Sequence, residues 1–87
     1  MLYMVVETFT AGAEAVYHHL REHGRGLPEG LRYVDSWVTI DRVRCFQLME
    51  TDDPALFEPW QRHWAGLVEI EVVPVTTSAQ AQAEAAS

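Results

Sequence analysis

The chain has 87 residues and a formal net charge of -7, because 13 acidic side chains face only six basic ones, all arginine. This balance disfavours binding to nucleic acid, whose phosphates require a basic face. The N-terminus lacks the positive region of a signal peptide, and no apolar run approaches the roughly 20 residues that span a bilayer. We therefore expect a cytoplasmic protein that binds neither nucleic acid nor membrane.

A chain of this length builds only a small hydrophobic core. Cys45 is the only cysteine, so an internal disulfide and a structural zinc cluster of thiolates are both excluded within one chain. Yet 48% of the residues are apolar, which is more than a domain of this size buries in its own core. A second copy of the chain is the obvious source of further burial, and we expect a homodimer.

The first half of the chain predicts a strand, a helix and a hairpin. Residues 2–9 are apolar at both parities, as in a central strand that is covered on both faces. Residues 11–24 carry apolar side chains at helical spacing and end at a glycine, which predicts a helix. Residues 32–40 and 43–51 predict two strands of a hairpin that turns near Asp41.

A second helix is predicted directly after the hairpin. Asp52 or Asp53 supplies its cap, and Pro54 suits the first helical position. Pro59 lacks a backbone N–H, so it should kink or shorten the first turns.

The last part of the chain predicts one strand and a tail. Residues 67–75 alternate as a half-exposed strand does, and Pro74 indicates that the end of this strand is unpaired or lies at an edge. Residues 77–87 are rich in Ala and Gln, which is typical of a low-complexity tail that is disordered or forms a frayed helix. Residues 1–76 are thus expected to form a single domain.

The predicted order is strand, helix, strand, strand, helix, strand, which is typical of α+β ferredoxin-like domains with a four-stranded antiparallel sheet. Right-handed crossovers place strands one and three in the centre of that sheet. The two helices cover only one face, while strand one is apolar on both. The second face is therefore expected to meet the sheet of another copy.

Three blocks of the sequence resemble a known family: GRGLPEGLRYVDSW (24–37), RCFQLMETDDPALF (44–57) and EIEVVPV (69–75). Over about residues 1–78 the chain is similar to a family of small bacterial proteins described only as a domain of unknown function. The resemblance implies a ferredoxin-like fold of the dimeric α+β barrel type, with no established activity. The chain departs from the family's usual pattern at Gly26 and Pro59.

Dimeric α+β barrels include cofactor-independent monooxygenases, haem-degrading enzymes, small lactone isomerases and ligand-binding regulators, with the site usually between the sheet and its helices. This is an analogy at the level of the fold and is weak evidence for a function.

The hairpin and the first strand offer one candidate site. Strict alternation places Tyr33, Trp37 and Arg44 on one face of the hairpin, with Cys45 on the other. Because strands one and three should be antiparallel neighbours, Glu7 and Arg44 are expected to pair across them. Such a pair is either a structural ion pair or a site in which Arg44 binds a carboxylate or enolate and Glu7 accepts a proton.

The second helix offers another candidate. His63 lies between Trp60 and Trp64, so a titratable imidazole and an aromatic wall coincide if this helix borders a cleft. The alternative is a histidine at the rim of a tryptophan-packed helix. Arg25 lies in the glycine-rich connector after the first helix, from which it can close over a ligand.

Metal and cofactor sites are not predicted. His19 and His23 form the only histidine pair at a spacing of four residues, and no carboxylate completes a metal motif. Cys45 has no activating base nearby in the sequence and is expected to act as a small apolar residue.

These observations leave three functions open. The first is a homodimer that binds a small apolar or aromatic molecule between sheet and helices, and the second is a cofactor-independent isomerase, cyclase or monooxygenase that acts in the same cleft. The third is a protein-association or regulatory dimer without a pocket. The candidate catalytic residues are His63, Glu7 and Tyr33, and the candidate ligand-binding residues are Arg44, Trp37, Trp60, Trp64 and Arg25.

Overall fold

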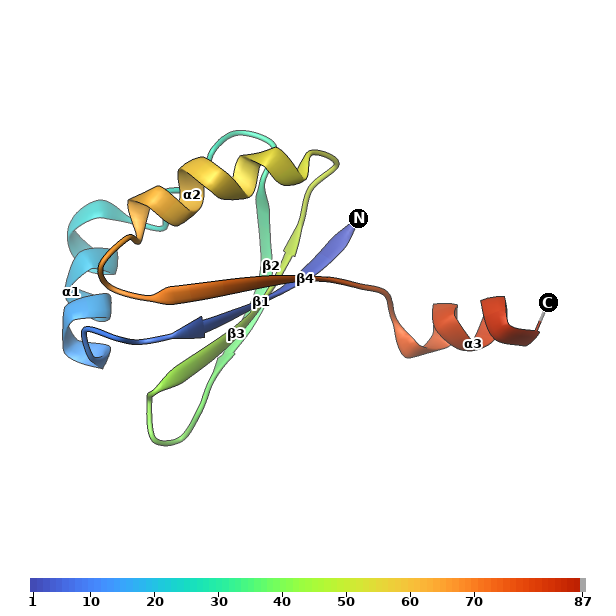
Figure 1. Cartoon of the computed structure of the whole chain (residues 1–87), viewed down its shortest axis with the longest axis horizontal. Coiled ribbons are helices and arrows are strands. Elements are labelled where there is room, and N and C mark those ends of the chain that lie inside the picture. The colour runs from blue at the N-terminus through green and yellow to red at the C-terminus, as the bar shows by residue number, and fades with distance from the viewer. Residues whose placement is uncertain (87) are drawn as a thin grey trace.

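The computed structural model describes residues 1–86 of the chain. Its elements, in order, are β1 (Leu2–Thr8), α1 (Ala13–His23), β2 (Arg32–Val38), β3 (Arg44–Glu50), the 3-10 helix η1 (Pro54–Leu56), α2 (Phe57–His63), β4 (Glu69–Val75) and α3 (Ser78–Ala86). The order β1-α1-β2-β3-α2-β4 confirms the predicted α+β ferredoxin-like fold (Figure 1). Within residues 1–86, no helix has the length and apolar character needed to cross a membrane.

The four strands form one antiparallel sheet in the order β2-β3-β1-β4. As predicted, the first and third strands are central. Pro74 lies in the edge strand β4, where a missing N–H removes no bond from a second neighbour.

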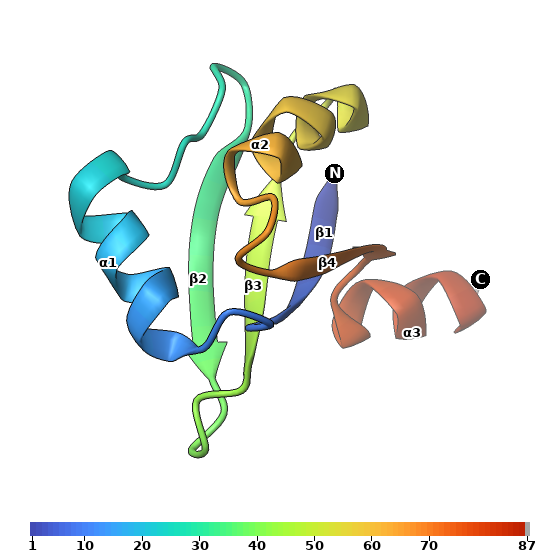
Figure 2. The same cartoon turned by 60° about the vertical axis from the view of Figure 1, so that its left-hand side comes forward.

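The helices α1 and α2 pack on one face of this sheet (Figure 2). Along β1 the side chains of Tyr3, Val5 and Glu7 are buried on that face, while the alternate residues are only partly buried. The core between the sheet and the helices consists of Tyr3, Val5, Phe9, Val16, Leu31, Cys45, Met49, Phe57, Trp60, Trp64 and Val68. The opposite face of the sheet, called the open face below, carries no helix of the ferredoxin-like unit.

A β-bulge in β2 overturns one part of the predicted hairpin. Tyr33 pairs with Met49, but the next pair is Asp35 with Leu48, so one extra residue interrupts the alternation. Tyr33 consequently shares the helix-covered face with Met49, while Trp37 lies on the open face. The prediction that Tyr33 and Trp37 share a face is wrong, because a single inserted residue reverses the parity of everything beyond it.

The second helix begins as predicted with an aspartate cap. The Asp53 carboxylate accepts a hydrogen bond from the Ala55 backbone N–H at 3.1 Å, and Pro54 follows at the first helical position. The segment then divides into η1 and α2, so that Pro59 is the third residue of α2. N–H groups in a first turn have no acceptor within their own helix, so proline is tolerated there. The predicted effect of Pro59 thus appears as a short α-helix of seven residues that has the proline in its first turn.

The segment after β4 forms the helix α3, of which no described side chain is buried. It extends away from the sheet (Figure 1). We expected a disordered tail or a frayed helix over 77–87, and residue 87 lies outside the described residues. The domain boundary near residue 76 stays a prediction.

Candidate functional site

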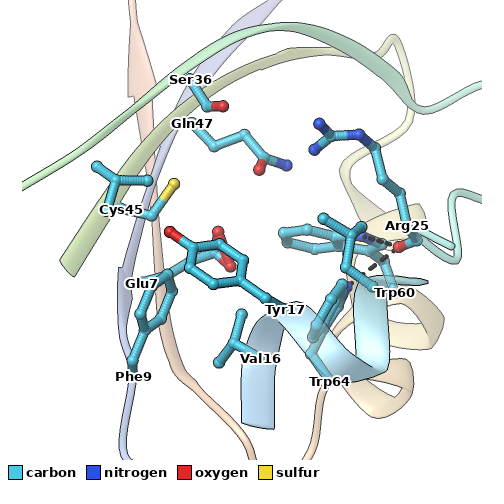
Figure 3. Close-up of a pocket in the computed structure, with 12 residues that line it drawn as sticks. Glu7, Phe9, Val16, Tyr17, Arg25, Ser36, Cys45, Gln47, Trp60 and Trp64 are labelled. Atoms are coloured by element: carbon cyan, nitrogen blue, oxygen red, sulfur yellow. Dashed lines mark hydrogen bonds between the residues drawn. The ribbon is translucent and has the colours of Figure 1, made fainter. Parts of the chain in front are cut away.

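A partly open pocket lies between α1, α2 and the helix-covered face of the sheet (Figure 3). Its volume is about 130 Å³, and a cavity of roughly 150 Å³ accommodates benzene. The apolar part of the lining consists of Phe9, Val16, Leu20, Val38, Trp60 and Trp64. The polar part consists of Glu7, Tyr17, Arg25, Ser36, Cys45 and Gln47. The pocket therefore suits a molecule the size of one ring with at least one polar group.

Two tryptophans, one in α2 and one at its C-cap, anchor the connector between α1 and β2. Trp60 and Trp64 lie one turn apart, and both indole N–H groups donate to the carbonyl oxygen of Arg25, at 3.0 and 3.1 Å (Figure 3). Both rings are buried. The backbone of Arg25 is thus held at the rim of the pocket by α2.

The side chain of Arg25 extends from that anchored backbone over the pocket. Its guanidinium carbon lies 3.8 Å from the centroid of the Tyr33 ring, a distance at which the cation is attracted to the aromatic face. Arg25 makes no ion pair with any carboxylate of residues 1–86. The guanidinium is therefore oriented by Tyr33 and available to a ligand.

Glu7 is the carboxyl group of the pocket. It projects from β1, and only 6% of its surface is exposed. Burial raises the pKa of this carboxyl from 4.5 to about 7, although a hydrogen bond from Cys45 and the charge of Arg25 oppose the rise. Both protonation states are populated near neutral pH, as proton transfer requires.

The raised pKa of Glu7 also links stability to pH. The folded chain holds this proton up to about pH 7, whereas the unfolded chain loses it near the ordinary value of 4.5. The folded state therefore binds more protons between these values. Its stability decreases as the pH rises through that window.

Cys45 lies beside Glu7 as a neutral thiol. Burial, with the neighbouring charge of Glu7, raises the pKa of the Cys45 thiol to about 12, so the nucleophilic thiolate is not formed at neutral pH. Ser36 also lines the pocket beside Glu7 and Cys45, and the Ser36 hydroxyl lies 2.6 Å from the hydroxyl of Tyr33. Polar side chains of β1, β2 and β3 therefore share this wall of the pocket.

Arg44 does not belong to this pocket. The register pairs Glu7 with Cys45 and Arg44 with Thr8, and successive residues of a strand point to opposite faces. The expected pairing of Glu7 with Arg44 is therefore wrong. Arg44 lies on the open face with its guanidinium carbon 5.8 Å from the Phe46 ring centroid.

A family model described as a domain of unknown function, DUF3303, matches residues 1–87. The chain belongs to this family. No curated protein and no solved structure matches it. The match confirms the family resemblance drawn from the three sequence blocks, and it assigns no activity to the pocket of this DUF3303 protein.

His63 is not among the residues that line the pocket. Its Nε2 lies 3.2 Å from the carbonyl oxygen of Gly24 and 3.2 Å from Nε2 of His19. Its ring also occupies the space beside Gly26, where an added Cβ would lie 2.3 Å from the imidazole. The His63 ring thus fills the space that a side chain at residue 26 would need.

The histidines do not assemble a metal site. His19, His23 and His63 lie close together at the junction of α1 and α2. Desolvation, with the neighbouring imidazoles of His63 and His23, lowers the pKa of His19. Within the part of the chain that the structure describes, no three His, Cys, Asp or Glu residues are placed to hold a metal ion.

The structure brings some of the candidate residues together and separates others. Glu7, Arg25, Trp60 and Trp64 line the pocket. Tyr33 lies against Arg25 and bonds to Ser36, whereas His63 lies at the helix junction and Arg44 and Trp37 lie on the open face.

Three polar lining residues were missed by the sequence analysis, namely Tyr17, Ser36 and Gln47. Tyr17 was identifiable as part of the inward stripe of the first helix. Gln47 was identifiable as a polar residue at the parity of Cys45 and Met49, on the strand face expected to be buried. Ser36 shares that face, and parity alone distinguishes it from Trp37.

The packing of His63 on Gly26 predicts a difference between two glycines. Gly24 and Gly26 both have positive φ, at 68° and 70°, but an added Cβ meets nothing within 4 Å at Gly24. Both Gly24→Ala and Gly26→Ala should destabilise the fold by about 1 kcal/mol through backbone strain. Gly26→Ala should cost about 1–3 kcal/mol more, because it displaces the imidazole. Urea unfolding of both variants measures the difference.

The control is the same pair of substitutions in a His63→Ala background. There the excess cost of Gly26→Ala should disappear. An excess that persists without the imidazole, or equal costs in the wild-type background, would contradict the contact.

Proposed function

We propose that this protein binds a small, mainly apolar molecule, about one ring in size, in the pocket between α1, α2 and the sheet. The main support is the composition of the pocket, in which aromatic and aliphatic walls surround a few converging polar groups, the usual character of a ligand site. The same observation disfavours a purely structural dimer without a pocket.

Benzamide is a suitable neutral probe of this proposal. Replacing Trp37 by Phe leaves two tryptophans of the three in the chain, and both line the pocket. Benzamide should change the fluorescence of this variant in a saturable way. Val38→Phe, which adds a ring at the pocket wall, should weaken binding by about tenfold, or about 1.4 kcal/mol.

Val34→Phe is the matched control. Val34 lies on the same strand and is exposed like Val38, but it does not line the pocket. Its replacement should leave the affinity unchanged. Equal losses in both variants, or no saturable change at all, would contradict binding in this pocket.

A second candidate function is acid–base catalysis in the same pocket without a cofactor. The observation that favours it is Glu7, a buried carboxyl with a pKa of about 7 at the pocket wall. A base with such a pKa is half ionised at neutral pH and is suited to remove a proton from carbon beside a carbonyl group. Arg25 is placed to stabilise the resulting enolate oxygen.

Cyclohexanone tests this second function. Its α-hydrogens should exchange for deuterium in D2O faster with the protein than without it, and NMR follows the exchange. The rate should rise with pH through about 7, because the ionised form of Glu7 is the base. Glu7→Gln should abolish the acceleration while benzamide binding is retained, and an unchanged rate in that variant would remove Glu7 as the base.

We further propose that the open face mediates homodimerisation. Residues of the four strands form an apolar surface there, namely Leu2, Met4, Val6, Trp37, Phe46, Leu48, Val73 and Val75. At one end of it lie Arg44, Glu69 and Glu71, which make no ion pair among residues 1–86. A second copy supplies apolar cover for the first set and opposite charges for the second.

Phe46→Lys tests the dimer. Sedimentation equilibrium of the wild type should give about 20 kDa, twice the 9.9 kDa of one chain. A lysine in the middle of the open face should shift the mass to that of one chain, because its charge would be buried without a partner.

Ile40→Lys is the control for added charge. Ile40 lies in the hairpin turn with 99% of its surface exposed, so its substitution should leave the dimer intact. A wild-type protein that sediments as a monomer at micromolar concentration would refute the proposal.

A further inference from the structure

The pocket contains one cation and one carboxyl group, and they are held in different ways. Arg25 is fixed by its carbonyl, which accepts from two tryptophans, and by its stacking on Tyr33. It nevertheless makes no ion pair within residues 1–86. A guanidinium that is preorganised and unpaired at the edge of an apolar pocket is a recognition group for a carboxylate or a similar oxyanion.

Glu7 determines whether such an anion is tolerated. Glu7 lines the same pocket and is buried. When Glu7 is ionised, its negative charge therefore repels an anion in the pocket, and the low dielectric strengthens this repulsion. When Glu7 is protonated, Arg25 carries the remaining charge in the pocket, and it attracts the anion. The pocket therefore offers two electrostatic states that differ by one proton on Glu7.

No other ionisable group replaces Glu7 in this role. Cys45 faces it from β3 and stays a neutral thiol, and Tyr17 from α1 and Arg25 from the connector also line the pocket. The neighbour of Glu7 on β4 is Ile70. The pocket-lining side chains from α2 and its C-cap are the two tryptophans, which do not titrate.

We infer that the ligand is a small single-ring carboxylate or equivalent oxyanion, that Arg25 binds its anionic group, and that it enters together with a proton that Glu7 takes up from solvent. This inference rests on the proposed pocket function and specifies the ligand class. The ring of the ligand contacts the apolar walls of the pocket. One anion and one proton are taken up together, and no bond of the ligand is made or broken.

Benzoate and benzamide form a matched pair of probes, since they have nearly the same shape and differ in charge. Benzoate stays ionised between pH 6 and 8, so any change in its affinity over this range belongs to the protein. With a pKa of about 7 for Glu7, linkage predicts that benzoate binds about tenfold more weakly at pH 8 than at pH 6. Benzamide should bind equally at both. Fluorescence of the Trp37→Phe protein measures both affinities.

Variants assign the effect to the two charged residues. Glu7→Gln should bind benzoate with the same affinity at pH 6 and pH 8. Arg25→Gln, which keeps the carbonyl that accepts from the tryptophans, should lose the preference for benzoate over benzamide at pH 6. Arg62→Gln is the matched control, because Arg62 is exposed and bonds to Glu58 on the outside of α2, and it should bind both probes as the wild type does.

The outcomes separate this inference from the proposed function. If benzamide binds but benzoate does not, or if benzoate binds without dependence on pH, the anionic ligand class is overturned and the pocket function stands. If neither probe binds, both fail. Urea unfolding checks the premise without any ligand: stability should fall from pH 5 to pH 8 in the wild type more than in Glu7→Gln, and identical profiles would overturn the inference.

Discussion

The pocket depends on the two hydrogen bonds that Trp60 and Trp64 donate to the carbonyl oxygen of Arg25. These bonds join residues 35 and 39 positions apart in the chain. Each contributes about 1 kcal/mol net, but an indole N–H left buried without an acceptor costs about 1–3 kcal/mol. The connector is therefore held against α2, and the position from which the Arg25 side chain extends follows from that anchor.

The fold was predictable because its signals are local. Apolar periodicity, an aspartate cap at Asp53 and glycine at the end of α1 define the elements. The handedness of crossovers then permits few arrangements of those elements, and the observed strand order is the expected one. Pro59 was expected to kink or shorten the first turns, since the loss of a backbone donor is a property of the residue itself, and it lies in the first turn of α2.

The site was less predictable because it depends on register and on long-range contacts. Glu7 faces Cys45, not Arg44, and a displacement of one residue along a strand transfers a side chain to the other face. The bulge moves Tyr33 beneath Arg25 in the same way. His63 lies one residue before Trp64 and so points about 100° away around α2. The acceptor for the two indoles is a backbone carbonyl, whose location no residue type reveals.

The free-energy cost of burying Glu7 links the proposed pocket to the proposed dimer. Keeping this carboxyl buried and ionised above pH 7 costs about 3 kcal/mol, because its pKa rises from 4.5 to about 7. A glutamine would occupy the position without that cost, and a chain of 87 residues has little stability to spare. A buried acid that opposes folding is characteristic of a binding or catalytic group. The apolar open face is the natural place to recover that free energy, so the proposed pocket and the proposed dimer support each other.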